Sequence, residues 1–434
     1  MPDGAAGVDG IGALAGRFAA DMARLAPFEP APALAAAVSG GADSLALALL
    51  AQDWVAARNG SLLALVVDHG LRRGSAFEVA LTAARLRGRG IPARILTLDG
   101  LLRGPGLAAR ARSARYAALG QACAEGGILH LLLGHHAGDQ AETLRMRQAA
   151  ASGARGLACM AGLVEDAKLR LLRPLLAVPG GRLRSLLRAE GLDWVEDPSN
   201  RDPATLRARL RRNIGDPSGE GEEVAALLHE SRVHGAMRAR EDDAIAVELA
   251  ARVRLHPSGW AVLRPGALSP AALSALLCTV AGRRYPAATA AVARLAASPR
   301  PATLAGVRLL PAGRAGAPGD LLVVREAAAM AAPVAALPLA VWDGRFQLSS
   351  AFHAAPGMTL GALGEDAARL RASRVGMARN GWPGAVLQSL PALRRQGELV
   401  AVPWIDAADA GACGRPDIAF CPALALATAP FLPI

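Results

Sequence analysis

Short apolar runs alternate with longer segments of helical spacing in the first third of the chain. Residues 33–38 (Ala-Leu-Ala-Ala-Ala-Val) and 61–67 (Ser-Leu-Leu-Ala-Leu-Val-Val) are almost wholly apolar, which is typical of strands buried on both faces of a parallel sheet. Between them, Ser44–Arg58 has the length and apolar spacing of a helix. Strand, helix and strand therefore follow one another here.

The same alternation continues to residue 151. Glu78–Arg89 fits a helix and Ala93–Leu98 a strand, while Ile128–Leu133 fits another strand and Gln140–Ala151 another helix. This repetition predicts an α/β fold with a doubly wound parallel sheet, and such sheets bind ligands at the carboxyl ends of their strands.

Changes in composition mark the predicted domain boundaries. Asp216–Glu222 is rich in Gly, Pro, Ser and acid, and a mainly helical stretch follows it. The strand-like Leu321–Val324 closes that second unit, and the alanine- and proline-rich Ala327–Pro338 resembles a linker. We predict an N-terminal extension (1–29), an α/β domain (30–215), a mainly helical domain (216–328) and a small C-terminal α+β part (329–434).

Composition excludes several classes of protein. No stretch of about 18 apolar residues is free of charges or turn formers, so we expect no membrane span. The first 30 residues lack the basic and apolar regions of a secretory signal, and we expect a cytoplasmic protein. The scattered cysteines form no C-x-x-C pair, which argues against a disulfide framework, structural zinc or an iron–sulfur cluster: Cys123, Cys159, Cys278, Cys413 and Cys421.

The chain is strongly basic, with a formal charge of +11 and a pI near 10.8. Clustered cations attract polyanions such as nucleic acids, because binding releases the phosphate counterions. However, Lys168 is the only lysine and alanine is abundant, which indicates a coding bias. Charge alone therefore leaves nucleic-acid binding open.

A glycine-rich hexapeptide follows the first predicted strand: Ser39-Gly40-Gly41-Ala42-Asp43-Ser44. Its glycines allow successive N–H groups to converge on an anion at the start of the next helix, and the serine hydroxyls can add donors. Asp43 repels phosphate unless a divalent cation intervenes, which indicates a site for Mg²⁺ and a polyphosphate. An ordinary glycine turn with a helix cap is the alternative, but the full hexapeptide in this context favours the phosphate site.

This hexapeptide resembles the S-G-G-x-D-S loop of the N-type ATP pyrophosphatases, or PP-loop enzymes, whose fold is adenine nucleotide alpha hydrolase-like. These enzymes cleave ATP between its α- and β-phosphates and adenylate a carbonyl oxygen. The resemblance implies ATP and Mg²⁺ as cofactors, nucleotide contacts along Ser39–Ser44, and Asp43 as a catalytic residue and metal ligand. Synthetases for GMP and asparagine, tRNA thiolases and lysidine synthetases share the loop, so the substrate stays open.

A second motif, Val66-Val67-Asp68-His69-Gly70-Leu71-Arg72, lies where the next parallel strand should end. It is similar to the V-D-H-G-L-R sequence of tRNA(Ile)-lysidine synthetases, and Ser75 and Glu78 match residues downstream of it. The resemblance implies that Asp68 and His69 contact the nucleotide. The alternative makes Asp68 a helix cap and His69 a packed loop residue.

A third motif, Ala111–Tyr116, resembles the A-R-x-x-R-Y of the same family. Arg112 and Arg115 are three residues apart and share a helix face. Guanidinium groups bind phosphate with two hydrogen bonds, so Arg112 is a candidate contact for ATP or the tRNA backbone. Solvated surface arginines are the alternative.

The fourth motif, Gly134–Thr143, resembles H-H-x-D-D-Q-x-E-T, with Gly138 in place of the first aspartate. By resemblance, Gly134 and His135 lie at the nucleotide. Asp139 and Glu142 share a helical face and are candidate catalytic residues that hold Mg²⁺ or orient a lysine amine, with Asp139 as the metal ligand. We expect Asp139 to suffice, so that Gly138→Asp changes turnover only modestly.

Basic elements follow. Arg173-Pro174-Leu175-Leu176 and the helix after it resemble the family's R-P-L-L segment, and Glu196–Asn200 matches its E-D-P-S-N. Arg207–Arg211 resembles its R-N-x-x-R element, with Ala208 in place of asparagine. The resemblance implies tRNA contacts by Arg173, Arg182, Arg207 and Arg211.

The four motifs together indicate a tRNA(Ile)-lysidine synthetase. Such an enzyme adenylates the wobble cytidine of the CAU anticodon of tRNA(Ile) and replaces its carbonyl oxygen with free L-lysine. The alternatives are a tRNA thiolase of the same loop family, for which the cysteine pair is missing, and a non-catalytic descendant that binds RNA or ATP. The oligomeric state is open, with a homodimer as one candidate.

Overall fold

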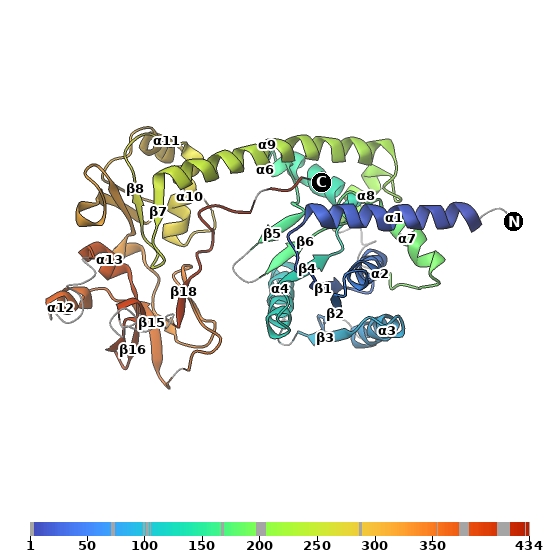
Figure 1. The fold of residues 1–434 in the computed structure, drawn as a ribbon, viewed down its shortest axis with the longest axis horizontal. Coiled ribbons are helices and arrows are strands. Elements are labelled where there is room, and N and C mark those ends of the chain that lie inside the picture. Colours follow the sequence, from blue (N-terminus) through green and yellow to red (C-terminus); the bar gives the residue numbers. More distant parts are fainter. Residues whose placement is uncertain are drawn as a thin grey trace. The chain divides into compact units, whose positions relative to one another are not determined.

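The computed structural model describes residues 4–70, 74–98, 100, 104, 106–165, 169–196, 205–285, 289–353, 355–372, 382–405, 417–429 and 431–433. The chain forms two compact units. The first comprises residues 1–240 together with 429–434, and the second comprises residues 241–428. The colours of Figure 1 follow the sequence through both units.

A six-stranded sheet forms the centre of the first unit, with strand order β3-β2-β1-β4-β6-β5. The first five of these strands are parallel, and β5 pairs antiparallel with β6. The chain order reverses between β1 and β4, which makes that crevice the topological switch point of a doubly wound sheet. The predicted fold class is thus confirmed in β1 (Ala33–Val38), β2 (Ser61–Asp68), β3 (Ala93–Thr97), β4 (His130–Leu133), β5 (Leu163–Glu165) and β6 (Arg170–Leu172).

Helices cover both faces of this sheet (Figure 1). Ala36 of β1 belongs to a core that includes α1, α2, α3 and α7, whereas the next residue, Ala37, belongs to a core that includes α4. Successive side chains of a strand point to opposite faces, so a continuous apolar run is what a sheet covered on both sides requires. The helices of this unit are α1 (Gly4–Arg24), α2 (Ala42–Ala56), α3 (Ser75–Gly88), α4 (Leu107–Glu125), α5 (Ala137–Ala149), α6 (Ala154–Leu157), α7 (Gly180–Ala189), α8 (Leu206–Ile214) and the first part of α9 (Glu222–Arg252).

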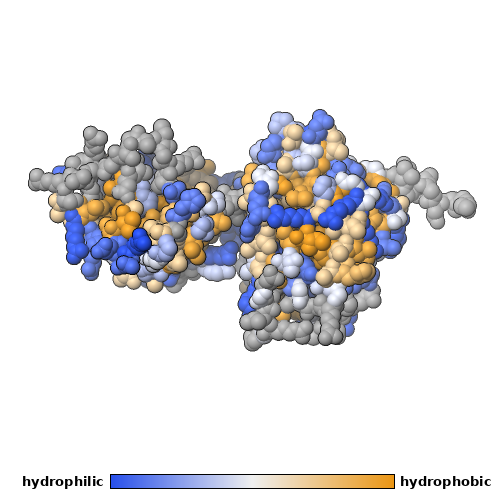
Figure 2. Space-filling model, turned by 90° about the horizontal axis from the view of Figure 1, so that it is seen from below, coloured by the Kyte–Doolittle hydropathy of each residue, from blue (hydrophilic) through white to orange (hydrophobic). Residues whose placement is uncertain are grey.

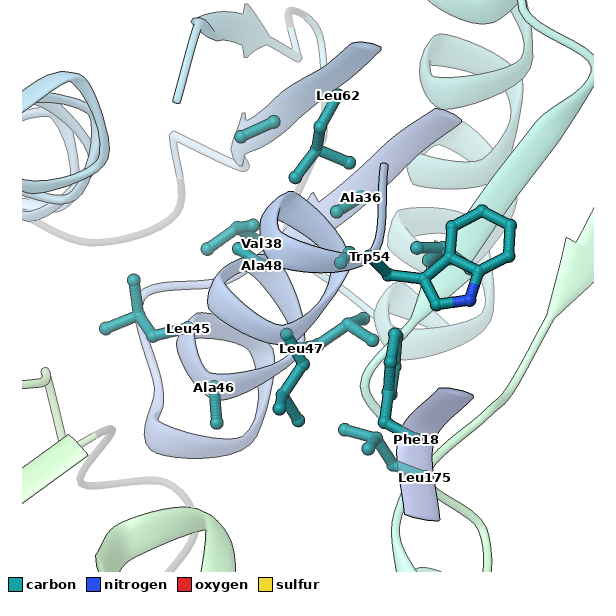
Figure 3. Close-up of a cluster of buried hydrophobic side chains, with 14 of the residues drawn as sticks. Phe18, Ala36, Val38, Leu45, Ala46, Leu47, Ala48, Trp54, Leu62 and Leu175 are labelled. Carbon is teal, nitrogen blue, oxygen red and sulfur yellow. The ribbon is translucent and has the colours of Figure 1, made fainter. Parts of the chain in front are cut away.

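The larger core lies around α2, whose side chains are buried on nearly every side. In Figure 3, Leu47 of α2 lies near Phe18 of α1 and Leu175, and the indole of Trp54 lies next to Phe18. Burial of each large side chain of this kind stabilises the fold by about 1.5–3 kcal/mol. The N-terminal helix α1 is therefore an integral layer of the unit.

The second unit contains three sheets together with helices. Of the strands in these sheets, the sequence predicted only β11. The orders are β7-β8-β11-β10-β9, β12-β15-β16-β17 and β13-β14-β18. The domain boundaries at 215 and 328 remain predictions. The elements are β7 (Val253–Leu255), β8 (Ala261–Leu263), α10 (Pro270–Ala281), α11 (Thr289–Ala297), β9 (Ala302–Leu304), β10 (Val307–Pro311), η2 (Gly313–Ala315), β11 (Leu321–Arg325), η3 (Ala327–Ala329), β12 (Val334–Ala335), β13 (Val341–Trp342), β14 (Phe346–Leu348), β15 (Met358–Ala362), α12 (Asp366–Ala372), α13 (Gly384–Ser389), β16 (Pro391–Arg395), β17 (Glu398–Ala401) and β18 (Ile418–Phe420).

On the face shown in Figure 2, hydrophobic side chains form several areas, and hydrophilic side chains lie between these areas. Within the described ranges, no helix has the length and apolarity needed to cross a membrane.

Candidate active site

The glycine-rich loop joins β1 to α2 at the switch point of the sheet. Gly40 has a φ of +87°, and a Cβ there would lie 2.6 Å from Oγ1 of Thr82. A Cβ on Gly134, at the end of β4, would lie 3.1 Å from Cα of Ser44. Both positions therefore require glycine, because neighbouring atoms lie where a side chain would begin. The loop packs tightly between its neighbouring elements.

The first turn of α2 has free backbone donors. Gly41 is the N-cap residue and makes no side-chain capping bond, so the N–H groups of the first turn are available to an anion. Ser44, which the sequence predicted as an additional donor for the ligand, makes hydrogen bonds within the loop. Its hydroxyl accepts from the N–H of Ser39 at 3.1 Å and donates to the carbonyl of Gly41 at 3.0 Å, so it holds the loop closed.

The end of β2 lies beside this loop in the sheet. Asp68 is buried, and its Oδ1 accepts from the N–H of Gly70 at 2.9 Å, which closes a local turn. Nδ1 of His69 is buried and has no partner. Burial lowers the pKa of His69, and the nearby Arg115 lowers it further, so this ring is neutral at pH 7. Leu71 and Arg72 of the motif lie outside the described residues.

α5 begins directly after β4, on the other side of the switch point. His136 is its N-cap, and Asp139 completes a capping box by accepting from the backbone N–H of His136 at 3.1 Å. Such reciprocal caps fix the start of a helix. This cap explains why α5 begins at Ala137, three residues before the predicted start at Gln140.

The carboxylates of Asp43 and Asp139 come together around His136. Nε2 of His136 is 3.5 Å from Oδ2 of Asp43 and 3.8 Å from Oδ2 of Asp139. Burial tends to raise the pKa of Asp139, but His136 and His135 lower it, and the net direction is downward. Burial also lowers the pKa of His135 to about 4. Asp139 is therefore ionised and His135 neutral at pH 7.

Glu142 lies one turn further along α5 and is 2% exposed. Its Oε1 accepts from Nε of Arg211 at 2.8 Å, and its buried Oε2 has no partner. Burial raises the pKa of Glu142, and the guanidinium of Arg211 opposes this shift. An open oxygen on a buried carboxylate is costly unless a ligand donates to it.

A cavity of about 780 Å³ opens between these elements. It is large enough for a nucleotide-sized ligand. Arg184 lies in α7, the helix after the R-P-L-L segment, and the sequence did not assign it to the site. Trp194 was missed because it stands in no motif that carries chemistry. The lining includes Asp43, Asp139, Glu142, Arg184, Trp194, Arg207 and Arg211.

Several expected site residues do not line this cavity. Arg182 is exposed and pairs with Glu220. Arg173 donates to the carbonyl of Ala161 at 2.8 Å, and burial lowers its pKa. Arg112 is exposed and lies over the ring of Tyr116 at 5.0 Å. Of the E-D-P-S-N segment, Glu196 lines the cavity and the rest lies outside the described residues.

The site fits Mg²⁺ only if a ligand completes it. No group of three or more His, Cys, Asp or Glu side chains is arranged to hold a metal within the part of the chain that the structure describes. Mg²⁺ is usually held by one or two carboxylates together with substrate phosphates. Asp43 and Asp139 can supply those carboxylates, and Oδ1 of Asp43 is buried without a partner.

Comparison with known proteins finds one matching family model and several relatives that share one name. The family model for the PP-loop domain matches residues 15–217. The chain is 42% identical to a tRNA(Ile)-lysidine synthase of Bradyrhizobium sp. strain BTAi1 over 212 aligned residues. This alignment covers 48% of this chain and 59% of that protein. It is 39% identical to the Hyphomonas neptunium tRNA(Ile)-lysidine synthase, covering 63% of this chain and 77% of that protein. It is also 33% identical to the Ruegeria pomeroyi tRNA(Ile)-lysidine synthase, covering 86% of this chain and 89% of that protein.

Proposed function

This chain belongs to the tRNA(Ile)-lysidine synthase family, and we propose that it converts the wobble cytidine of the CAU anticodon of tRNA(Ile) to lysidine. In the proposed reaction, the O2 oxygen of the cytidine attacks the α-phosphate of ATP and pyrophosphate leaves. The ε-amine of free L-lysine then attacks C2 of the base and AMP leaves with the former carbonyl oxygen. The amine gives up a proton in this second step.

The observation that carries the proposal is a set of open polar atoms around one cavity. Oδ1 of Asp43 and Oε2 of Glu142 are buried without partners, and the first turn of α2 has uncapped N–H groups. Arg207 and Arg211 line the same cavity. Acceptors and donors that are left unsatisfied in this way indicate that a polar, charged ligand completes the site.

The PP-loop suits the polyphosphate of ATP. Its N–H groups and the positive end of the α2 dipole stabilise the charge that develops as pyrophosphate leaves. Asp43 and Asp139 would hold Mg²⁺, which neutralises phosphate charge when it is bound. The contribution of the chain is mainly to position the reactants and to stabilise charge.

Glu142 suits the lysine amine. Its open Oε2 is a buried acceptor close to Asp139, and an ammonium group supplies three donors. A buried carboxylate with a raised pKa is also able to accept a proton from that amine. Before the reaction, the same group would orient the amine toward the base.

Arginines around the cavity suit the phosphates of the anticodon loop. Unpaired bases of a loop can be splayed out and read individually, and backbone phosphates pair with guanidinium groups. Arg184, Arg207 and Arg211 line the cavity, so they are candidate contacts for the RNA next to the reacting base.

The test is nucleoside mass analysis of tRNA(Ile) after incubation with the protein, ATP and lysine. We expect lysidine to form, with ATP–pyrophosphate exchange that depends on tRNA. Exchange without lysidine would favour a different nucleophile, such as the sulfur donor of a thiolase. Absence of both would mean a non-catalytic descendant that binds RNA or ATP.

The Asp43→Ala variant connects this activity to the loop. We expect it to abolish adenylation and to leave tRNA affinity within a few-fold, because Asp43 acts through the cation and ATP. Lysidine formation at the wild-type rate would remove the loop from the mechanism.

A further inference from the structure

The imidazole of His136 is fixed at the start of α5. Its backbone is extended, and Nδ1 accepts from the N–H of Gly138 at 3.0 Å. Since Nδ1 acts as an acceptor, it carries no proton, and the proton of the neutral ring is on Nε2. The ring therefore presents a single donor in a fixed direction.

Nε2 lies near two carboxylates from different elements. Asp43 belongs to the first turn of α2, and Asp139 belongs to the first turn of α5. Nε2 of His136 is within 4 Å of both, at 3.5 and 3.8 Å. α2 and α5 follow the neighbouring strands β1 and β4, so the ring bridges the two sides of the switch point.

Two glycines make room for this ring. A Cβ on Gly138 would lie 2.8 Å from Cε1 of His136, and a Cβ on Gly180 would lie 3.2 Å from the same atom. Neither glycine has a positive φ, so other residues could adopt the backbone conformation at both positions. An added side chain would therefore meet the ring at both positions, and at Gly138 the contact is too short to form without a shift.

We propose that His136 is a positioning residue that sets the separation of Asp43 and Asp139, and that in this chain its ring is seated against Gly138 and Gly180. The inference rests on the proposed function, in which the two aspartates hold the cation of Mg²⁺-ATP. Groups that orient metal ligands change metal affinity by about 10- to 100-fold when they are removed.

The first experiment separates the donor from the helix cap. In His136→Asn, the amide oxygen can still accept from the N–H of Gly138, because asparagine is a good N-cap residue. The donor at Nε2 is lost. We expect the Mg²⁺ concentration that half-saturates ATP binding, measured by calorimetry on the full chain, to rise about tenfold while the melting temperature without ligands changes little.

A double-mutant cycle then tests the glycine cradle. Gly138→Ala should weaken Mg²⁺-dependent ATP binding in the wild-type background, because its Cβ displaces the ring. In the His136→Asn background it should add little, since the shorter side chain does not reach the position of Cε1. Gly153→Ala is the control, because Gly153 also lies at the start of a helix with a negative φ, as its N-cap, and a Cβ there meets nothing within 4 Å.

The outcomes are distinguishable. If the wild-type chain binds ATP with Mg²⁺ and the variants keep its Mg²⁺ midpoint, or if the two substitutions act additively, the positioning role is rejected and the proposed function stands. If the wild-type chain does not bind ATP with Mg²⁺ at all, the proposed function is rejected and this inference with it.

Discussion

Gly138 lies beside the imidazole of His136, close enough that an added Cβ would stand 2.8 Å from Cε1. Motif reasoning treated this position as a missing charge and expected Gly138→Asp to change turnover only modestly. The structure gives a steric reason to expect a larger effect, since real Cβ contacts under 3.0 Å essentially do not occur. The ring or the start of α5 must move to admit any side chain.

Gly138→Asp should therefore lower turnover by about tenfold or more, because a misplacement of about 1 Å at a catalytic group costs up to about 100-fold in rate. The measurement is lysidine formation at saturating ATP, lysine and tRNA. Gly153→Asp, where a Cβ meets nothing within 4 Å, is the control and should keep wild-type turnover. A Gly138→Asp variant that is as active as the wild type, or more active, would contradict the steric account.

At the scale of elements, the sequence predicted the helices and strands whose apolar residues form a clear pattern. β1, β2 and β4 were predicted because they are continuous apolar runs, which a sheet covered on both faces requires. The hairpin of β5 and β6 was missed, because strands of three residues are too short to show a period. Their pairing depends on partners that are distant in sequence.

The sequence predicted where the loops of the candidate site lie, but it did not predict which side chains contact one another there. The hexapeptide Ser39–Ser44 stands at a strand end in both the sequence pattern and the structure. No motif indicates that Ser44 closes this loop, or that Glu142 pairs with Arg211. The Ser44 contacts are local, but a serine at a helix start can equally well face a ligand, and the Glu142–Arg211 pair joins residues 69 positions apart whose approach depends on packing.

Helix α8 carries arginines that differ in their position. All four arginines at positions 207, 209, 211 and 212 are exposed, but only Arg207 and Arg211, four residues apart on one face, line the cavity. The buried Ala208 lies between the two faces. The two pairs therefore differ in whether they face the cavity, not in their exposure.

The Arg207→Gln/Arg211→Gln double variant should weaken tRNA binding and lower the slope of log affinity against log salt by about 1 to 2, because each lost phosphate contact removes released counterions. The measurement is filter binding of tRNA(Ile) from low to physiological salt. Arg209→Gln/Arg212→Gln removes the same charge and should change the slope less. Equal slopes for the two double variants would show that general charge, and not the cavity face, binds the RNA.

A buried histidine fixes the segment between α1 and β1. Nε2 of His130 is 2.9 Å from Oε2 of Glu29, and Nδ1 is 3.3 Å from the guanidinium of Arg170. Arg170 also donates to the carbonyl of Pro27 at 2.6 Å. Because Nδ1 faces a cation, the ring is held in its neutral form with the proton on Nε2.

Stability should consequently depend on pH through His130. Burial lowers the pKa of His130 below its ordinary value of 6.5 in the folded chain. The unfolded chain therefore takes up this proton first as the pH falls, so the stabilisation is present above pH 6.5 and is lost below it. The melting temperature of His130→Asn should fall less steeply than that of the wild type below pH 6.5. A slope equal to that of His229→Asn, which replaces an exposed histidine, would contradict this assignment.

At the scale of the whole molecule, the chain passes twice between its two units. α9 carries it out of the first unit, and residues 429–434 belong to the first unit again. The carbonyl of Leu432 accepts from the N–H of Gly162 at 3.1 Å, and that of Pro433 accepts from Arg24 at 2.7 Å. Phe431 is 4% exposed. This tail is thus a packed part of the first unit although it follows the second in sequence.

Phe431→Ala should destabilise the first unit selectively. The ring lies 4.4 Å from the guanidinium of Arg238 and is buried, and truncation of a buried phenylalanine costs about 3 kcal/mol or more. Each unit has its own core, so we expect two calorimetric transitions, of which Mg²⁺-ATP raises the one that belongs to the first unit. Phe431→Ala should lower that transition by several degrees and leave the other in place. Tyr285→Ala, which removes an aromatic ring that is 76% exposed in the second unit, is the control and should move neither transition. If Phe431→Ala shifts both transitions equally, the tail stabilises the molecule as a whole and the two units do not unfold independently.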